Sequence, residues 1–186
     1  MKELESIIRL FKDRFEQQAG RVYEAETLDE AASKLSNILL EQNVRRVAIA
    51  GMDEQVRERI RESLTSVGME IVEPRGGNAH ETINSAEAGV TLASFAVADI
   101  GAIAEITNDD ADRLVSSLPR IHACLLQRQN IIDTFENSAQ LIRDALSSSR
   151  SCVVSFIGGP SRTGDIELKL VLGVHGPHQV HVIIFG

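Results

Sequence analysis

The sequence predicts an α/β fold: a single domain in which helices flank a mostly parallel sheet that also has an antiparallel portion. Its 186 residues are enough for one domain with a sizeable core and too few for two ordinary domains. Residues 46–72 have the pattern strand, helix, strand at short spacing, which is typical of the βαβ unit of a parallel sheet. Short apolar runs between residues 89 and 127 indicate the antiparallel portion.

The first third of the chain predicts two amphipathic helices and the βαβ unit. Apolar residues recur on one helical stripe from residue 4 to residue 15, and Gly20 ends this helix, so residues 1–20 form an N-terminal amphipathic helix. Thr27 and Glu30 form a capping box before a second helix. The elements that follow are a strand at 46–51, a helix carrying Val56, Ile60 and Leu64, and a strand at 69–72.

The rest of the chain predicts shorter elements. Pro119 separates two runs that we expect to be consecutive antiparallel strands, 114–118 and 122–127. The complete prediction is a loop with one short helix at 74–88, strands at 89–93, 96–106, 114–118 and 122–127, a helix at 133–146, and strands at 151–157 and 180–185.

Charge and composition exclude several classes of protein. The chain has 19 basic and 27 acidic side chains, and its net charge of −8 disfavours nucleic-acid binding. No apolar run reaches the roughly 20 residues of a membrane-spanning helix, and the N-terminus lacks a signal-peptide pattern, so we expect a cytoplasmic protein. Cys124 and Cys152 lie far apart without metal-ligand spacing, so we expect neither zinc nor an iron–sulfur cluster on this chain.

A glycine-rich loop after residue 157 is the strongest candidate binding site. Backbone N–H groups of such a loop can hold an anion, an arginine adds a planar fork for phosphate or carboxylate, and hydroxyls add hydrogen bonds. The alternative is a structural turn in which Asp165 caps a helix that begins there and Arg162 is paired internally. The predicted ligand-binding residues are Gly158, Gly159, Ser161, Arg162, Thr163, Gly164 and Asp165.

Two residues are candidates for acid–base catalysis. His175 lies beside a Gly-Pro turn and is placed to act as a general acid or base. Glu105 ends an apolar run of small residues, where burial can make a carboxylate a base or a nucleophile. Arg113, Pro119 and His122 follow closely enough to face the same cleft. For each catalytic candidate the alternative is an ordinary structural role. We expect the glycine-rich loop and the turn at His175 to line one cleft.

Five segments together carry a family resemblance. The motifs Gly-Pro-Ser-Arg-Thr and Gly-Val-His-Gly-Pro, in this order and spacing, are highly specific, and over residues 40–186 the chain resembles the LUD domain family. Its short length without appended cysteine clusters is similar to the LutC-like lactate utilization members of that family. The five segments are residues 89–91, 98–105, 117–122, 159–167 and 173–177.

The resemblance implies a NagB/ribose-phosphate isomerase/CoA-transferase-like fold. It also implies a role beside partner subunits that oxidise lactate through iron–sulfur clusters, with no cofactor on this chain itself. At one point the sequence departs from the family. Members continue the acidic residue with Thr-Gly-Thr, whereas Glu105 is followed by Ile106, Thr107 and Asn108.

Two functions are consistent with the sequence. In the first, the chain is a non-redox subunit or accessory protein of an iron–sulfur lactate oxidation system. In the second, it is a stand-alone enzyme, similar to a CoA-transferase or sugar-phosphate isomerase, that binds a small anionic ligand at the Gly-Pro-Ser-Arg-Thr loop. Neither function involves nucleic acid or a membrane, and the sequence does not predict an oligomeric state.

Overall fold

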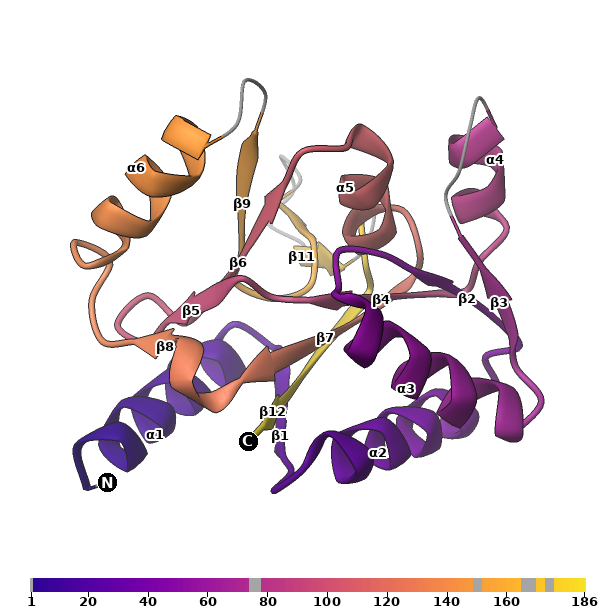
Figure 1. Ribbon diagram of the computed structural model, residues 1–186, viewed down its shortest axis with the longest axis horizontal. Coiled ribbons are helices and arrows are strands. Elements are labelled where there is room, and N and C mark those ends of the chain that lie inside the picture. The colour runs from indigo at the N-terminus through magenta and orange to yellow at the C-terminus, as the bar shows by residue number, and fades with distance from the viewer. Residues whose placement is uncertain (1, 74–77, 149–151, 165–169, 173–175) are drawn as a thin grey trace.

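A six-stranded sheet, parallel at every pairing, forms the centre of the computed structural model (Figure 1). The structure describes residues 2–73, 78–148, 152–164, 170–172 and 176–186. The predicted α/β class and the βαβ unit are confirmed, since β2 and β3 pair in parallel. In spatial order the strands are β1 (Arg21–Glu24), β12 (Gln179–Phe185), β7 (Ile121–Gln127), β4 (Ala88–Leu92), β2 (Arg46–Ile49) and β3 (Glu70–Val72).

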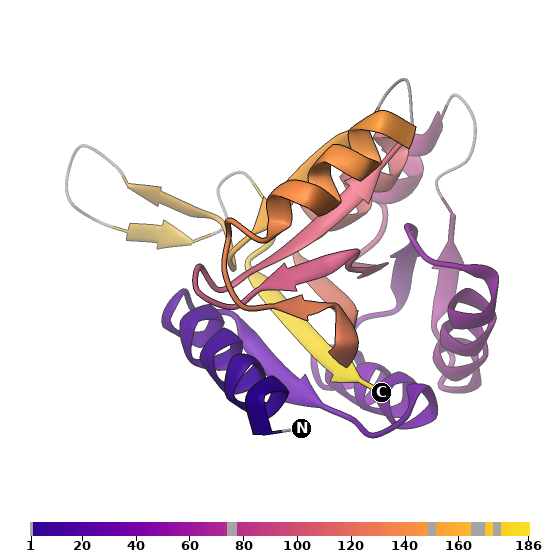
Figure 2. The ribbon, with the colours of Figure 1, turned by 60° about the vertical axis from the view of Figure 1, so that its left-hand side comes forward.

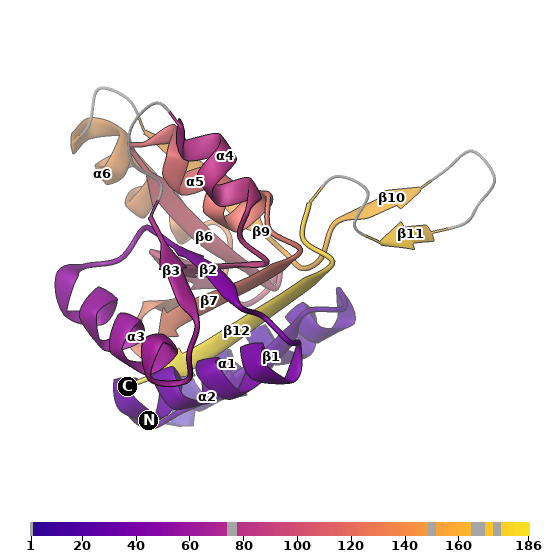
Figure 3. The same cartoon turned by 90° about the vertical axis from the view of Figure 1, so that its right-hand side faces the viewer.

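A second sheet of four strands packs against one face of the first and supplies the predicted antiparallel portion. β6 pairs antiparallel with both of its neighbours, β5 and β9, whereas β5 and β8 pair in parallel. A separate antiparallel hairpin projects from the body of the molecule (Figure 2, Figure 3). The second sheet comprises β8 (Ile131–Ile132), β5 (Phe95–Val97), β6 (Ala102–Thr107) and β9 (Val153–Ile157), and the hairpin β10 (Arg162–Gly164) and β11 (Leu170–Leu172).

Helices cover both faces of the central sheet. Two of them, α2 and α3, pack on one face, where Leu35 and Ile60 join the cluster of Val90. The other face is covered by α1 and the second sheet, with α4 and α5 beside them, and α6 lies on the outer face of the second sheet. None of the described helices is long and apolar enough to cross a membrane. The helices are α1 (Lys2–Gln17), α2 (Leu28–Glu41), α3 (Glu54–Ser66), α4 (Ala79–Asn84), α5 (Asp110–Ser117) and α6 (Ser138–Ser148), with a 3-10 turn η2 (Arg128–Asn130) after β7.

Helix α2 begins where its sequence pattern predicts. Thr27 Oγ1 accepts a hydrogen bond from Glu30 N at 3.2 Å, which satisfies one of the free N–H groups of the first turn. The Glu30 carboxylate accepts a second bond, from Glu26 N at 2.8 Å, so it reaches one residue further back than in the usual capping box. The capping box is therefore confirmed, with this change of partner.

Two predictions around Pro119 are wrong. Residues 114–118 form the last turn of α5 and the residue after it rather than a strand, because Asp109 caps the helix by accepting from Ala111 N, and Leu114 and Leu118 lie one turn apart on its buried side. The following strand, β7, pairs in parallel with β4 and with β12, not antiparallel. A short apolar run is compatible with a strand or with a helix, and here the Asp109 cap stabilises the helix.

Other boundaries also differ from the predictions. The helix expected to begin near Asp165 does not extend through residues 170–172, which form β11 and pair antiparallel with β10; residues 165–169 lie outside the described residues. The strand expected over 96–106 is divided into β5 and β6 by a turn in which Gly101 has φ +59°. The short strands β1 and β8 are not predicted, and α6 begins five residues after the expected start at residue 133.

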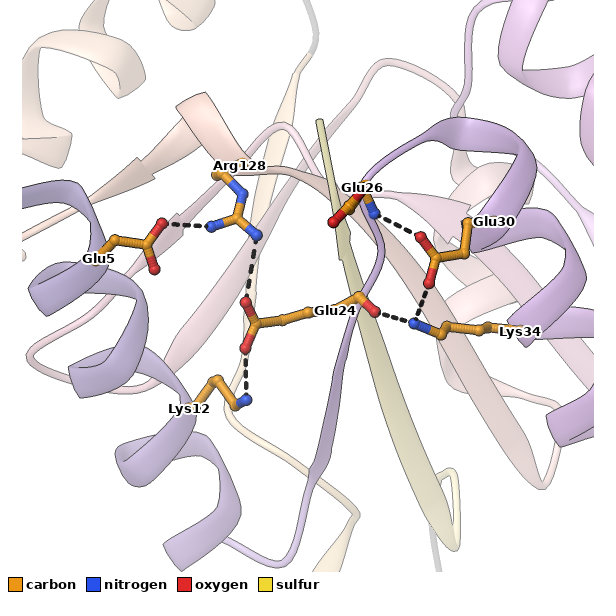
Figure 4. Close-up of polar contacts among 7 residues, drawn as sticks. All are labelled: Glu5, Lys12, Glu24, Glu26, Glu30, Lys34 and Arg128. Atoms are coloured by element: carbon orange, nitrogen blue, oxygen red, sulfur yellow. Dashed lines mark hydrogen bonds and ion pairs between the residues drawn. The ribbon is translucent and has the colours of Figure 1, made fainter. Parts of the chain in front are cut away.

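A network of charged side chains fastens α1 across the carboxyl ends of β1 and β7 (Figure 4). Glu24, at the end of β1, accepts hydrogen bonds from Lys12 at 2.6 Å and from Arg128 at 3.2 Å, and Arg128 also binds Glu5 at 2.9 Å. The hydrogen bond from Lys12 is the main cause that lowers the pKa of Glu24. Lys34 of α2 donates to the main-chain oxygen of Glu24, so the network also reaches the opposite face of the sheet.

Candidate functional site

A cavity of about 410 Å³ lies at the amino ends of β7 and β12. Three parts of the chain surround it: the last residues of β9 with the loop that follows, the end of α5, and the turn before β12. Among the lining residues are Arg113, Ser116, Ser117, Ser155, Gly158, Gly159, Ser161, Gly176 and Pro177. The cavity thus combines one cationic side chain with several hydroxyl groups and exposed main chain.

The glycine-rich loop and the turn before β12 touch each other at this cavity. Ser161 N donates a hydrogen bond to Pro177 O at 3.0 Å, and a Cβ on Gly176, which has φ +144°, would lie 3.2 Å from Ser161 Cβ. The described parts of both segments therefore line one cavity, as the sequence predicts for the cleft. His175 and Asp165 lie outside the described residues.

Three other predicted ligand-binding residues are described only as main chain. Arg162, Thr163 and Gly164 form β10, and the structure does not describe the side chains of this strand. The assignments of Arg162 as the anion anchor and of His175 as the acid or base therefore stay predictions. Gly158 and Gly159 pack against the end of α1, where a Cβ on Gly159 would lie 2.6 Å from Gln18 O.

Arg113 on α5 supplies the positive charge of the cavity. Its Nη2 donates to Asp110 Oδ1, whereas its Nε is buried without a hydrogen-bond partner among the described residues. The hydroxyls of Ser116 and Ser117 both donate to the main-chain oxygen of Arg113, at 3.1 and 2.9 Å. A buried donor without a partner is costly, so a ligand that accepts a hydrogen bond here is favoured.

Glu105 lies directly beneath the cavity. It pairs across β6 and β9 with Ser155, so both side chains are on the face of the second sheet that looks toward the central sheet, and Glu105 is only 4% exposed. There it meets residues of β4 and β7. Thr91 Oγ1 donates to Glu105 Oε1 at 2.5 Å and lies 2.7 Å from His122 Nε2, and His122 Nε2 lies 3.3 Å from Glu105 Oε1.

The hydrogen bonds decide the charge of Glu105. Burial acts to raise the pKa of Glu105, but the hydrogen bond and electrostatic attraction of His122, with the hydroxyls of Thr91 and Ser116, outweigh it and hold the pKa below the ordinary 4.5. Glu105 is therefore an ionised carboxylate at neutral pH. Ser116, which lines the cavity, is thus one of the residues that lower the pKa of Glu105, so the cavity and the buried cluster are adjacent.

Sequence reasoning found part of this cluster and missed the rest. It identified Glu105, and it named Arg113 and His122 as neighbours of the same cleft. It did not identify Thr91 or Cys124 as members of the cluster. These two residues lie next to each other only because β4 and β7 pair in the register that places Thr91 opposite Cys124. The available signal was the alternation of His122 and Cys124, which places both side chains on one face of a strand.

The glycine turn that the sequence lacks after Glu105 is found at the start of the same strand, β6. Asp99 is followed by Ile100 and Gly101, and Gly101 has the positive φ that this turn requires. A side chain at Gly101 would also collide with α1, since its Cβ would lie 2.7 Å from the main-chain carbon of Arg14. An acidic residue, a spacer and a turn glycine therefore occur at the start of β6 rather than at its end.

Comparisons with known proteins agree with the resemblance seen in the motifs. The LUD domain family model matches residues 8–185. Lactate utilization protein C of Anoxybacillus flavithermus is 34% identical over 110 residues, which cover 59% of this chain and 49% of that protein. Lactate utilization protein C of Bacillus subtilis is 30% identical over 125 residues, 64% of this chain and 52% of that protein. The chain thus spans about half the length of the curated relatives it matches.

A solved structure shows the same fold. The crystal structure of a DUF162 family protein from Deinococcus radiodurans superimposes with a TM-score of 0.71 over 98% of both chains, at 23% sequence identity. Because the family model covers nearly the whole chain, from the middle of α1 to the end of β12, the match includes every strand of the central sheet. This protein therefore belongs to the LUD domain family.

Proposed function

We propose that this chain is a LutC-like, non-redox component of a lactate utilization system and that it holds a small hydroxycarboxylate in the cavity beside α5. The observation that carries the proposal is the pairing of Arg113, with its unpartnered Nε, and Ser116 in the lining of one cavity. The names of the relatives support the choice of process, since both relatives described above are named lactate utilization protein C.

The charge around the cavity favours a ligand with a single negative charge. Arg113 can bind a carboxylate through its free Nε. Arg113 is the one cation among the lining residues that the structure describes, and its Nη2 already pairs with Asp110, so a phosphate or another multiply charged group would lack a second counter-charge. A small monocarboxylate therefore fits the cavity better than a sugar phosphate.

The hydrogen bonding of Ser116 favours a hydroxyl on the ligand. Its single hydroxyl proton is donated to the main-chain oxygen of Arg113 at 3.1 Å. Ser116 Oγ can therefore offer a ligand only its lone pairs, and the ligand group that binds there must be a donor. A 2-hydroxy acid has such a donor next to its carboxylate, whereas a 2-oxo acid has none.

The proposal places redox chemistry that uses iron–sulfur clusters on partner subunits. Such a cluster takes four cysteine ligands, and the sequence contains two cysteines. Purification of the tagged chain from its native source tests this part. We expect an iron–sulfur protein to copurify, and its absence from repeated purifications under anaerobic conditions would contradict the partnership.

Calorimetric titration with L-lactate, pyruvate, acetate and phosphate tests the ligand. We expect L-lactate to bind more tightly than pyruvate or acetate, and Arg113→Gln to weaken binding by roughly 10- to 150-fold, which corresponds to the loss of one charged hydrogen bond. The exposed Arg143 on α6, changed to Gln, is the matched control and should leave affinity unchanged. The proposal fails if no carboxylate binds, or if both variants bind equally.

The second candidate is a stand-alone enzyme of the CoA-transferase or sugar-phosphate isomerase type. The ionised Glu105 beneath the cavity favours it, because a carboxylate in that place can act as a base on a bound ligand. A thermal-shift panel of CoA esters and sugar phosphates distinguishes the two candidates. Stabilisation by these compounds and not by hydroxy acids would favour the enzyme.

A further inference from the structure

We propose that Glu105, His122 and Cys124 form a binding site for one divalent transition-metal ion of the Zn²⁺ type. The three residues come from two different sheets, β6 of the second and β7 of the first, and are all buried. One ligand atom from each lies within 4.8 Å of the other two. The spacing of the residues along the chain does not reveal this set, because Glu105 reaches the others across the interface between the sheets.

The donor chemistry and one distance fit such an ion. Carboxylate oxygen, imidazole nitrogen and thiolate sulfur together suit zinc and its neighbours, such as cobalt, better than magnesium or calcium. With metal bonds of about 2.0–2.1 Å, a nitrogen and an oxygen ligand of a tetrahedral ion lie about 3.3 Å apart. His122 Nε2 and Glu105 Oε1 are already 3.3 Å apart.

Thr91 occupies the second shell of this arrangement. Its hydroxyl donates to Glu105 Oε1, so His122 Nε2 carries the proton in the bond to Thr91 Oγ1. An ion replaces only that N–H bond, because a ligating imidazole nitrogen is deprotonated. The bond from Thr91 to Glu105 remains and orients the carboxylate, as the outer partners of metal ligands commonly do.

A divalent ion would bring positive charge next to a buried carboxylate, because Glu105 is only 4% exposed. On binding, Cys124 releases its thiol proton to solvent and coordinates as a thiolate, so affinity should rise with pH.

The cavity lies next to the site, since Ser155, which lines the cavity, pairs with Glu105 across β9 and β6. Three protein ligands leave one position of a tetrahedral ion for water or another ligand, which is the arrangement of catalytic rather than structural zinc.

Cobalt titration of the chelator-treated full chain tests the proposal. We expect thiolate-to-cobalt charge-transfer absorption that saturates at one Co²⁺ per chain and is abolished by added Zn²⁺. Cys124→Ser should remove this absorption, whereas the matched control Cys152→Ser, at the other cysteine, should retain it. Absence of the absorption in the unmodified chain, or its persistence in Cys124→Ser, would overturn the proposal.

X-ray absorption at the zinc edge of the unmodified chain tests the same site if Cys124→Ser does not fold. We expect one sulfur ligand and otherwise nitrogen or oxygen ligands. A shell with no sulfur, or with more than one, would overturn the assignment.

Discussion

Replacing Gly89 by alanine should destabilise the protein and displace α5 from the cavity. Gly89 pairs with His122 in the central sheet, and α5 lies so close that a Cβ on Gly89 would be 1.8 Å from the main-chain oxygen of Val115. Cβ atoms in proteins essentially never come within 3.0 Å of another atom in such a contact, so α5 has to move away by at least about 1.2 Å.

The size of the effect follows from what the new methyl group meets. Because it meets helix main chain, local side-chain movement cannot relieve the strain, and we expect the upper end of overpacking costs, about 3 kcal/mol. For a chain of this length that lowers Tm by roughly 6–12 °C. Gly158→Ala is the matched control: its methyl group would meet Gln18 Oε1, the end of a flexible side chain, and should cost about 1 kcal/mol or less.

Urea unfolding monitored by circular dichroism measures both variants against the unmodified chain. We expect a lower midpoint with unchanged m for Gly89→Ala, and weaker carboxylate binding, because Arg113 and Ser116 move with α5. A loss of less than about 1 kcal/mol of unfolding free energy in Gly89→Ala, or a loss no larger than in Gly158→Ala, would show that α5 does not restrict this position.

Three further predictions follow from the buried and charged side chains. Burial, with Arg21 and His122, lowers the pKa of His181 to about 4. As the pH falls below about 6.5, His181 takes up a proton in the unfolded chain but not in the native state. Acid therefore favours unfolding, and up to about 3 kcal/mol of stability should be lost by pH 4. Urea titrations should show this loss reduced in His181→Gln and retained in the control His178→Gln, at an exposed histidine. Arg128→Gln removes two partly exposed ion pairs, so global stability should fall by less than about 1 kcal/mol. Hydrogen exchange in α1 should become faster, and unchanged exchange would contradict the role of the network. Arg162→Lys should weaken anion binding by roughly 1.5–3 kcal/mol without changing Tm, and the reverse result would make Arg162 a structural clamp.

Elements with strong local signals could be predicted from the sequence. The cap at Thr27 and the spacing of Val56, Ile60 and Leu64 identify α2 and α3, because capping and one-sided burial act within a few residues. Residues 114–118 could not be assigned correctly, since a five-residue apolar run lacks a period of its own. The four residues of β1 carry no clear alternation, and their strand exists because β12 offers a parallel partner.

The candidate site, like the fold, could be predicted only where the sequence signal is local. Glu105 is recognisable because a carboxylate in a run of small apolar residues is unusual. The sequence also places His122 in the same cleft. The contact with Thr91 is not recognisable, because it depends on the register of β4 with β7 and on how the second sheet packs across them.

The charged network over the carboxyl ends of the sheet has a practical consequence. α1 begins and β12 ends on that side of the molecule (Figure 1), whereas the cavity opens at the amino ends of β7 and β12. A tag or surface anchor attached at either end of this chain would therefore leave the cavity mouth free. Protein immobilised in this way could report ligand binding optically.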